Sequence, residues 1–369
     1  MLILLIGVHL LVAEDNTEKI AKKIGLEIVN REMPGYSRKK LKEGFEYRSP
    51  KNRIIKNSKV IDRIEELRIP PAWENVWICE KGNGHLQAVG RDAKNRMQYI
   101  YHPLWTKLRS EAKFDKMIPF AKSLHLIRKQ YEKDLKSEKM SKSKVIGMVI
   151  KLMDTTFIRI GSEEYAQKND TFGLSTLREK HMKIIKGKEA EGELDIVFEF
   201  TGKSGKSWIR KVEDDDFAKM IIEAGKIGGN KKEQDLFMFE DEQGVARDLK
   251  AEHVNEYLAK ITGEKFSAKD FRTWGATYLA GKNLSEMEYL ETQKARKKNI
   301  TQMVKSVSET LGNTPAVCRG SYIHPVVIDD YMGGGFEKKW SAAIKTSSRI
   351  KIKLNREEKV MLHYLENSN

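Results

Sequence analysis

The chain has 369 residues, which is room for about two domains. Hydrophobic residues make up 40% and charged residues 33%, a balance that excludes a wholly disordered chain and favours packed cores. The formal net charge of +15 at pH 7 favours a polyanionic partner, because each neutralised phosphate releases a condensed counterion. A basic enzyme without such a partner is the alternative. The two cysteines, Cys79 and Cys318, exclude a disulfide framework and a Cys-rich zinc site, which favours a reducing compartment.

The chain opens with an apolar leader, residues 1–16, that begins MLILLIGVHLLVAED. A signal peptide would carry Lys or Arg before its apolar core, and none is present here. The apolar run is also too short to span a bilayer. We therefore expect a frayed or misassigned start, or a short buried segment, rather than a secretion signal. No later stretch has the length and apolarity of a membrane helix, so we expect no membrane association.

Residues 17–107 predict a small N-terminal domain built on a β-sheet. The run NVWICEKGNGHLQAVGRDAKNRMQYIYHP has the pattern of three strands, with a turn at Asn83-Gly84 between the first two. Asn-Gly suits a tight hairpin turn because both central positions need a positive φ. Alternation across residues 98–101 predicts a strand with one face in water.

The remainder, residues 108–369, predicts a larger and mainly helical domain. Residues 121–144 hold eight Lys or Arg against three acids and predict a basic helix and linker, whose cations face either solvent or phosphate. Ser267 has the features of a helix N-cap. A further helix ends at Gly312, Asn313 and Pro315, and its apolar face is expected to comprise Ile300, Met303, Val304, Val307 and Leu311.

One β-hairpin, ELDIVFEFTGKSGKSWIRKV, is expected inside this helical domain. Its two Gly-Lys-Ser triplets resemble the end of a nucleotide-binding P-loop. A P-loop also needs a glycine five residues before its last glycine, and Val197 and Phe200 occupy those positions. The segments on both sides are strands, so the hairpin is not a P-loop.

The stretch LGNTPAVCRGSYIHPVVI offers two candidate nucleophiles, Cys318 and Tyr322. A free phenol has a pKa near 10, so Tyr322 would need positive charge or a proton acceptor beside it. For a phosphodiester target, arginines would stabilise the developing charge and a lysine would protonate the leaving oxygen. Cys318 lacks the His and acid partners of a cysteine protease and is interpreted as a packing residue.

Five short blocks stand in order: FIRIG at 157–161, FTGKSGK at 200–206, KDFRTWG at 269–275, LGNTP at 311–315 and SYIHP at 321–325. Together with residues 69–105, they resemble the type IB DNA topoisomerases, most closely the compact poxvirus and bacterial branch. The resemblance covers roughly residues 30–350. It implies an α+β fold, with a small N-terminal β-sheet domain and a larger, mainly α-helical catalytic domain of the tyrosine recombinase/topoisomerase IB type that carries a β-hairpin.

The resemblance also implies catalytic roles. Tyr322 would attack a DNA phosphodiester and become linked to the 3′ phosphate, while Arg159 and Arg272 would bind that phosphate. Lys203 would act as general acid for the 5′ oxygen, and Asn313 would donate a hydrogen bond to a non-bridging oxygen. Poxvirus members carry histidine at the Asn313 position and bacterial-type members carry asparagine.

Positions that match DNA contacts in the family are Gln98, Tyr99, Tyr101 and Tyr165. Poxvirus enzymes have a base-contacting lysine after the glycine of the FIRIG block, where this chain has Ser162 followed by two glutamates. We therefore expect broader cleavage than the poxvirus enzymes show.

The implied activity is relaxation of supercoiled duplex DNA by transient single-strand cleavage, strand rotation and religation, without ATP, metal or another cofactor. A monomer would clamp the duplex in a cytoplasmic, nucleoid-associated setting of bacterial type. The nearest alternative is a tyrosine recombinase, but these usually have His three residues before the second arginine, where Lys269 stands here. The other alternative is a non-catalytic basic DNA-binding protein.

Overall fold

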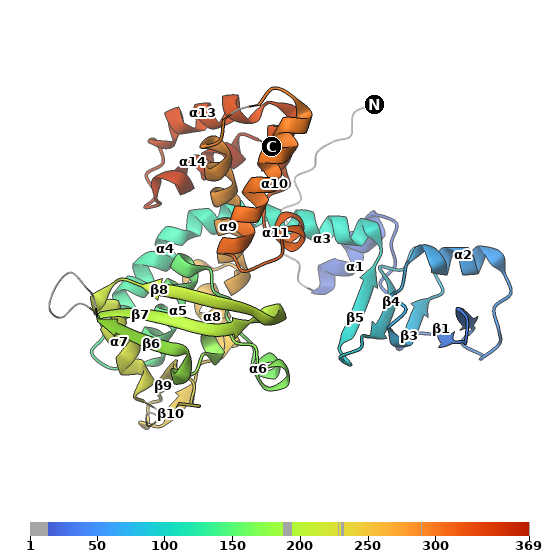
Figure 1. The fold of residues 1–369 in the computed structure, drawn as a ribbon, viewed down its shortest axis with the longest axis horizontal. Helices are drawn as coiled ribbons and strands as arrows, with labels where there is room; N and C mark the ends of the chain where they lie inside the picture. The colour runs from blue at the N-terminus through green and yellow to red at the C-terminus, as the bar shows by residue number, and fades with distance from the viewer. Residues whose placement is uncertain (1–13, 187–193, 228, 230–231, 289, 369) are drawn as a thin grey trace. The chain divides into compact units, whose positions relative to one another are not determined.

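The structure is a computed structural model that describes residues 14–186, 194–227, 229, 232–288 and 290–368. The chain divides into two compact units, Met1–Asp115 and Lys116–Asn369, which are drawn in Figure 1. Most of the expected leader, residues 1–13, lies outside the described residues, and the first helix, α1, spans Glu14–Lys23.

The N-terminal unit is built around a five-stranded antiparallel sheet with strand order β2-β1-β3-β4-β5. Helix α2 packs on one face of this sheet through Ile64, which contacts Ile78 and Ala88. Because neighbouring strand residues point to opposite faces, Cys79 joins a second cluster on the other side, with Val89. Helix α3 packs with Trp105 against Leu26. The bounds of these elements are β1 Gly35–Lys40, β2 Phe45–Arg48, α2 Ser58–Glu66, β3 Glu74–Cys79, β4 Leu86–Arg91, β5 Met97–Tyr101 and α3 Pro103–Asp115.

The connection between β3 and β4 differs from the predicted tight turn. Neither Asn83 nor Gly84 has a positive φ, and the loop runs over residues 80–85. The loop is wider because a second segment pairs with it: the Glu27 amide donates to the Asn83 carbonyl at 2.9 Å. An ideal Cβ on Gly84 would lie 2.6 Å from Cys79 Sγ, so close packing requires this glycine.

The C-terminal unit is mainly helical, and α5 and α9 run through its core. Helix α5 buries both Val149 and Ile150, and α9 buries Phe271 and Trp274. None of the helices in the described part of the chain has the length and apolarity of a membrane span. The helix bounds are α4 Met117–Leu135, α5 Lys142–Thr156, α6 Glu163–Asn169, α7 Asp215–Gly225, α8 Ala251–Thr262, α9 Ala268–Ser285, α10 Gln293–Thr310, α11 Pro315–Ser321, α12 Pro325–Gly333, α13 Phe336–Ser347 and α14 Arg356–Glu366.

The helix signals read from the sequence are confirmed. Ser267 is the N-cap of α9, and its amide donates to Asp270 at 2.7 Å. Helix α10 buries its predicted apolar face and ends at Thr310, followed by Gly312 with φ +58°. The basic segment 121–144 forms most of α4 and the start of α5. Helix α4 packs in the core, however, because it buries Leu124 and Ile127.

The predicted hairpin is confirmed as β7 (Leu194–Gly202) and β8 (Lys206–Val212), joined by a short turn at Lys203–Gly205. Strand β6 (Met182–Lys186) pairs with β7 and completes a three-stranded antiparallel sheet. A separate ribbon of β9 (Met238–Glu240) and β10 (Ala246–Asp248) lies near α7 (Figure 1). An N-terminal sheet and a larger helical part with a hairpin confirm the predicted fold class.

Candidate active site

Tyr322 lies directly after α11 and is only 9% exposed. Its backbone is fixed by Thr277 of α9, whose hydroxyl donates to the Tyr322 carbonyl at 3.2 Å and accepts from the His324 amide at 3.0 Å. The guanidinium carbon of Arg272, also on α9, lies 5.1 Å from the centre of the Tyr322 ring. One helix therefore positions both the tyrosine and a cation beside it.

Arg272 is 2% exposed, which is unusual for a guanidinium. Nη2 donates to the Leu311 carbonyl at 2.7 Å, and Nη1 donates to the Phe157 carbonyl. Within the described residues, Nε has no hydrogen-bond partner. Burial, helped by the positive charge of Arg159, lowers the Arg272 pKa to about 10. A buried cation held by carbonyls, with its Nε donor unpaired in the described part of the chain, is suited to receive an anion.

Arg159 reaches the same place from the segment after α5. Phe157 ends α5 in the left-handed region at φ +57°, and its ring packs where Gly275 leaves space on α9. Arg159 Nη2 donates to Asn313 Oδ1, a residue 154 positions away, and Nη1 lies 3.5 Å from the Gly312 carbonyl. Burial lowers the pKa of Arg159, and the nearby Tyr322 hydroxyl opposes that shift.

The two arginines change the chemistry of the Tyr322 phenol. Burial by itself would raise the phenol pKa, because the charged form loses hydration. The positive charges of Arg272 and Arg159 outweigh burial, so the pKa of Tyr322 lies below its ordinary value. A phenol with a lowered pKa between two guanidiniums is a stronger nucleophile at neutral pH than a free tyrosine.

Asn313 contributes an oriented amide to this cluster. The residue is 4% exposed, and its Oδ1 accepts from Arg159. Its Nδ2 is buried without a hydrogen-bond partner in the described part of the chain. The free donor fits the predicted role, donation to an oxygen of a bound ligand.

Lys203 lies at the exposed tip of the hairpin. Its Nζ is 5.5 Å from the centre of the Tyr165 ring on α6, close to the hairpin tip in Figure 1. The structure therefore brings Tyr322, Arg159, Arg272 and Asn313 together and places Lys203 with Tyr165. A second hairpin lysine, Lys206, had no predicted role, yet its Nζ donates to the Asn313 carbonyl.

The other predicted DNA contacts lie on β5 of the N-terminal unit. Tyr99 and Tyr101 are 50% and 36% exposed and point to the same face, where their rings stack with centres 6.2 Å apart. Gln98 alternates to the other face and donates to Asp92 at 2.9 Å. Strand β5 thus presents the rings of Tyr99 and Tyr101 to solvent, whereas the side-chain amide of Gln98 binds Asp92 on the other face.

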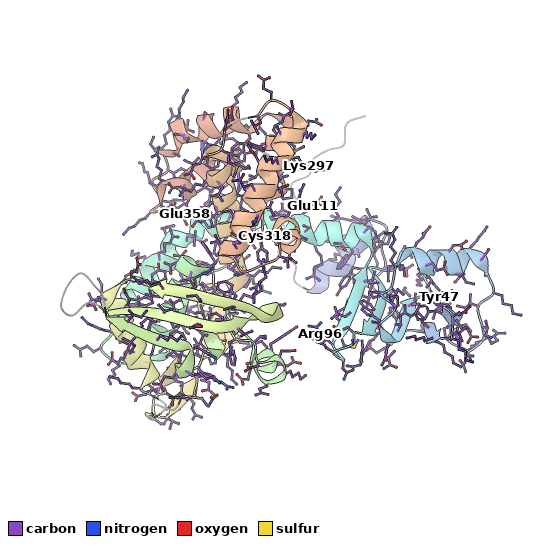
Figure 2. The ribbon with its side chains drawn as sticks, in the orientation of Figure 1. Tyr47, Arg96, Glu111, Lys297, Cys318 and Glu358 are labelled. Atoms are coloured by element: carbon purple, nitrogen blue, oxygen red, sulfur yellow. The ribbon has the colours of Figure 1, made fainter. Side chains whose placement is uncertain are left out.

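Cys318 lies on α11 one turn before Tyr322, as labelled in Figure 2, and is fully buried. Burial raises the pKa of its thiol to about 11, even though Arg272 favours the thiolate. A thiol with that pKa is almost entirely protonated at neutral pH. Its interpretation as a packing residue agrees with this environment.

Two family models match the chain. The model described as the catalytic core of eukaryotic DNA topoisomerase I matches residues 105–345. The model described as the N-terminal domain of bacterial DNA topoisomerase IB matches residues 44–92. The four clustered residues of the candidate site all lie within the first match.

Two viral proteins are similar over most of their length, and a fungal one over a smaller part. DNA topoisomerase 1B of Acanthamoeba polyphaga mimivirus is 32% identical over 302 residues, which cover 81% of this chain and 88% of that protein. DNA topoisomerase 1B of vaccinia virus (strain Copenhagen) is 23% identical over 286 residues, 76% of this chain and 82% of that protein. DNA topoisomerase 1 of Schizosaccharomyces pombe is 28% identical over 196 residues, 52% of this chain and 22% of that protein. With both family models matching in sequence order, the chain belongs to the type IB DNA topoisomerases.

Proposed function

We propose that this chain relaxes supercoiled duplex DNA by cutting one strand through a 3′-phosphotyrosine, allowing rotation, and resealing the strand. The observation that carries this proposal is the cluster of the Tyr322 phenol with the guanidiniums of Arg272 and Arg159. The names of the similar proteins and the net charge of +15 support DNA as the substrate.

In the cleavage step, the Tyr322 phenol, whose pKa is lowered, gives its proton to water, and its oxygen attacks phosphorus to form a new phosphoester bond. The bond to the 5′ oxygen breaks, and the departing oxygen takes the electron pair together with a proton from Lys203. Arg159 and Arg272 stabilise the charge on the non-bridging oxygens, and the free amide donor of Asn313 adds a hydrogen bond. For Lys203 to act, the hairpin tip has to bring it from Tyr165 to the leaving oxygen.

Resealing is the reverse reaction, in which the 5′ hydroxyl attacks the phosphotyrosine. The ester with tyrosine conserves the energy of the broken linkage, so neither ATP nor a metal is required. We infer that a monomer binds the duplex with both units, and that Tyr99, Tyr101 and Tyr165 offer aromatic contacts. We infer that the enzyme acts in the cytoplasm, in association with the nucleoid.

The first test is the Tyr322→Phe variant in a plasmid relaxation assay with EDTA and without ATP. We expect the wild type to relax the plasmid and to leave a protein–DNA adduct that SDS traps. Tyr322→Phe should bind DNA but form no adduct, because it lacks the attacking oxygen. Tyr278→Phe, which removes a phenol from α9 in the same unit, is the matched control and should still cleave.

The same assay separates the alternatives. A tyrosine recombinase would need its recombination site, whereas a topoisomerase monomer relaxes plasmid without one. A non-catalytic binding protein would show salt-sensitive binding and no adduct in the wild type. An adduct that persists in Tyr322→Phe would overturn the assignment of the nucleophile.

A further inference from the structure

The turn formed by the last residue of α10 and the three residues after it, residues 310–313, is surrounded by cationic side chains. Each of its four consecutive carbonyl oxygens faces a different cation. The pairs are Thr310 with Arg210 at 2.7 Å, Leu311 with Arg272 at 2.7 Å, Gly312 with Arg159 at 3.5 Å, and Asn313 with Lys206. The last carbonyls of a helix carry its negative dipole end, and Thr310 is the last residue of α10, so cations are favoured at this end of the helix.

The two inner carbonyls of this turn hold the guanidiniums that flank Tyr322. The two outer carbonyls are held by Lys206 and Arg210, and both of these come from β8. Neither residue contributes to the proposed chemistry. Two side chains of the hairpin therefore bind the first and last carbonyls of the turn, and the two carbonyls between them bind the guanidiniums of Arg272 and Arg159.

Trp208, which lies between these two cations on β8, also contacts the turn. Positions 206, 208 and 210 point to one face of the strand. An ideal Cβ on Gly312 would lie 2.2 Å from the Trp208 ring, so the indole packs directly on the turn. The Arg210 guanidinium in turn lies 4.5 Å from the centre of the Trp208 ring. One face of β8 thus makes apolar and polar contacts with the same four residues.

We propose that Lys206 and Arg210 are positioning residues for strand cleavage. By fixing the outer carbonyls of the turn, they fix its inner carbonyls and Asn313, and through these the guanidiniums of Arg159 and Arg272 beside Tyr322. This inference rests on the proposed phosphotyrosine chemistry and adds two residues that touch neither the DNA phosphate nor the nucleophile.

The neighbouring Lys211 supplies the matched control. It lies on the same strand but points to the opposite face, where it pairs with Asp195 at 2.8 Å and Glu213 at 2.9 Å. Replacing Lys206 or Lys211 by methionine removes the same charge and keeps a long side chain. Only the change at 206 removes a donor to the turn.

The experiment measures single-turnover cleavage of a duplex oligonucleotide at a site first mapped with the wild type. Lys206→Met and Arg210→Met should each cleave on the order of tenfold more slowly than Lys211→Met, since each loses one charge-assisted hydrogen bond. Cleavage and resealing should slow equally, so the fraction of covalent adduct at equilibrium stays constant. Lys206→Arg, which keeps a donor, should recover most of the rate.

A substrate with sulfur in place of the bridging 5′ oxygen separates positioning from proton donation. A thiolate leaves without a proton, because its conjugate acid has a pKa near 8.5. In cleavage, the Tyr322 phenol loses its proton to water, its oxygen forms a bond to phosphorus, the phosphorus–sulfur bond breaks, and sulfur leaves as a thiolate with the electron pair. We expect sulfur to restore the rate of Lys203→Met but not of Lys206→Met.

Two results would overturn the inference alone: Lys206→Met and Arg210→Met cleaving as fast as Lys211→Met, or sulfur restoring the rate of Lys206→Met. The second result would identify Lys206 as the proton donor. A wild type that forms no adduct would overturn the proposed function itself. Thermal unfolding checks that each variant folds, and if Lys206→Met does not, Arg210→Met tests the other end of the same turn.

Discussion

Gly312 meets two requirements that no other residue type meets together. Its φ of +58° lies in the left-handed region, and its α-carbon faces the Trp208 ring. Gly312→Ala should therefore lower the free energy of unfolding by about 2 kcal/mol or more, because backbone strain and steric overlap add. Urea unfolding at neutral pH measures this loss. The same variant should cleave DNA more slowly, since the turn carries Asn313.

Gly320 provides the control for that substitution. It lies in α11, and an added Cβ would meet open space. Gly320→Ala should leave stability unchanged or raise it by about 0.5–1 kcal/mol, because alanine is the better helix former. Equal destabilisation by the two substitutions would contradict the role given to Trp208.

At the residue scale, the sequence identified the candidate catalytic side chains but not all of the residues that contact the site. The blocks KDFRTWG and SYIHP, which resemble the family, identified Arg272 and Tyr322, and the structure brings these two together. Lys206 was missed because its partner, the Asn313 carbonyl, lies 107 positions away. The available signal was the alternation of Lys206, Trp208 and Arg210, which predicts a shared face but not what that face contacts.

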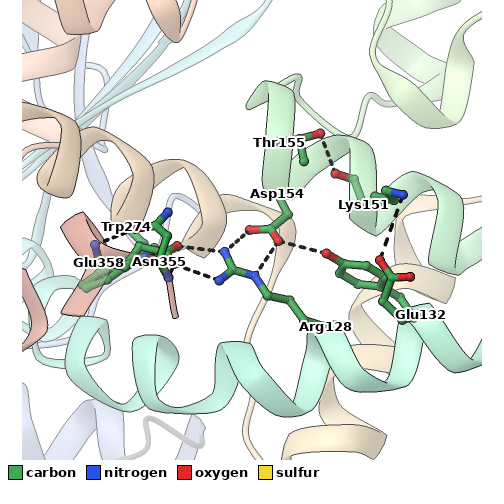
Figure 3. Close-up of polar contacts among 9 residues, drawn as sticks. Arg128, Glu132, Lys151, Asp154, Thr155, Trp274, Asn355 and Glu358 are labelled. Atoms are coloured by element: carbon green, nitrogen blue, oxygen red, sulfur yellow. Dashed lines mark hydrogen bonds and ion pairs between the residues drawn. The ribbon is translucent and has the colours of Figure 1, made fainter. Parts of the chain in front are cut away.

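At the element scale, a buried ionic network joins four helices (Figure 3). Arg128 of α4 binds Asp154 of α5 at 2.8 Å and Glu358 of α14 at 2.8 Å. Glu358 also accepts from Trp274 Nε1 of α9 at 3.2 Å. These bonds offset the cost of burying the charges, and they connect the C-terminal helix to the helix that carries Arg272.

Removing the cation from this network should be strongly destabilising. Arg128→Met would leave two carboxylates without their partner and should lower the free energy of unfolding by about 3–5 kcal/mol. Denaturant unfolding measures the change. Lys122→Met, which removes a cation from the same helix but breaks an exposed pair with Glu366, should cost about 1 kcal/mol or less. Similar losses for both variants would show that the network is no stronger than a surface pair.

Helix α4, which carries Arg128, shows what a charge pattern in the sequence predicts and what it does not predict. Residues 121–144 were expected to form a basic helix with cations toward solvent or phosphate, and the helix is present. Arg128 turns inward because its carboxylate partners stand 26 and 230 positions away, beyond the reach of local periodicity. The prediction of a tight turn at Asn83-Gly84 was wrong for a similar reason, since the loop forms backbone hydrogen bonds with Glu27, which lies 56 positions before Asn83.

At the scale of the whole molecule, every residue of the clustered site belongs to the C-terminal unit. A fragment of residues 116–369, once shown by circular dichroism to be folded, should therefore form the covalent adduct by itself. It should bind DNA more weakly and with a shallower salt dependence than the full chain, because it lacks the basic N-terminal unit with Tyr99 and Tyr101. SDS gels measure adduct formation, and binding titrations at several salt concentrations measure affinity.

A folded fragment that binds DNA without forming an adduct would show that the N-terminal unit supplies part of the chemistry. The order of a sheet-containing part followed by a helical part was predictable, because strand alternation gives way to helical periodicity near Leu104. Strand β6 and the β9–β10 ribbon were not predicted. These strands are short and occur within a region read as helical.

The environment of the two thiols has a practical consequence for labelling experiments. Cys79 and Cys318 are both buried, and burial raises the pKa of each thiol. Maleimide reagents attack the thiolate, so the native chain should take up little dye while folded. A single cysteine introduced on the surface of each unit could then carry a fluorophore while Cys79 and Cys318 stay in place. Energy transfer between the two dyes would report the distance between the units with and without duplex DNA.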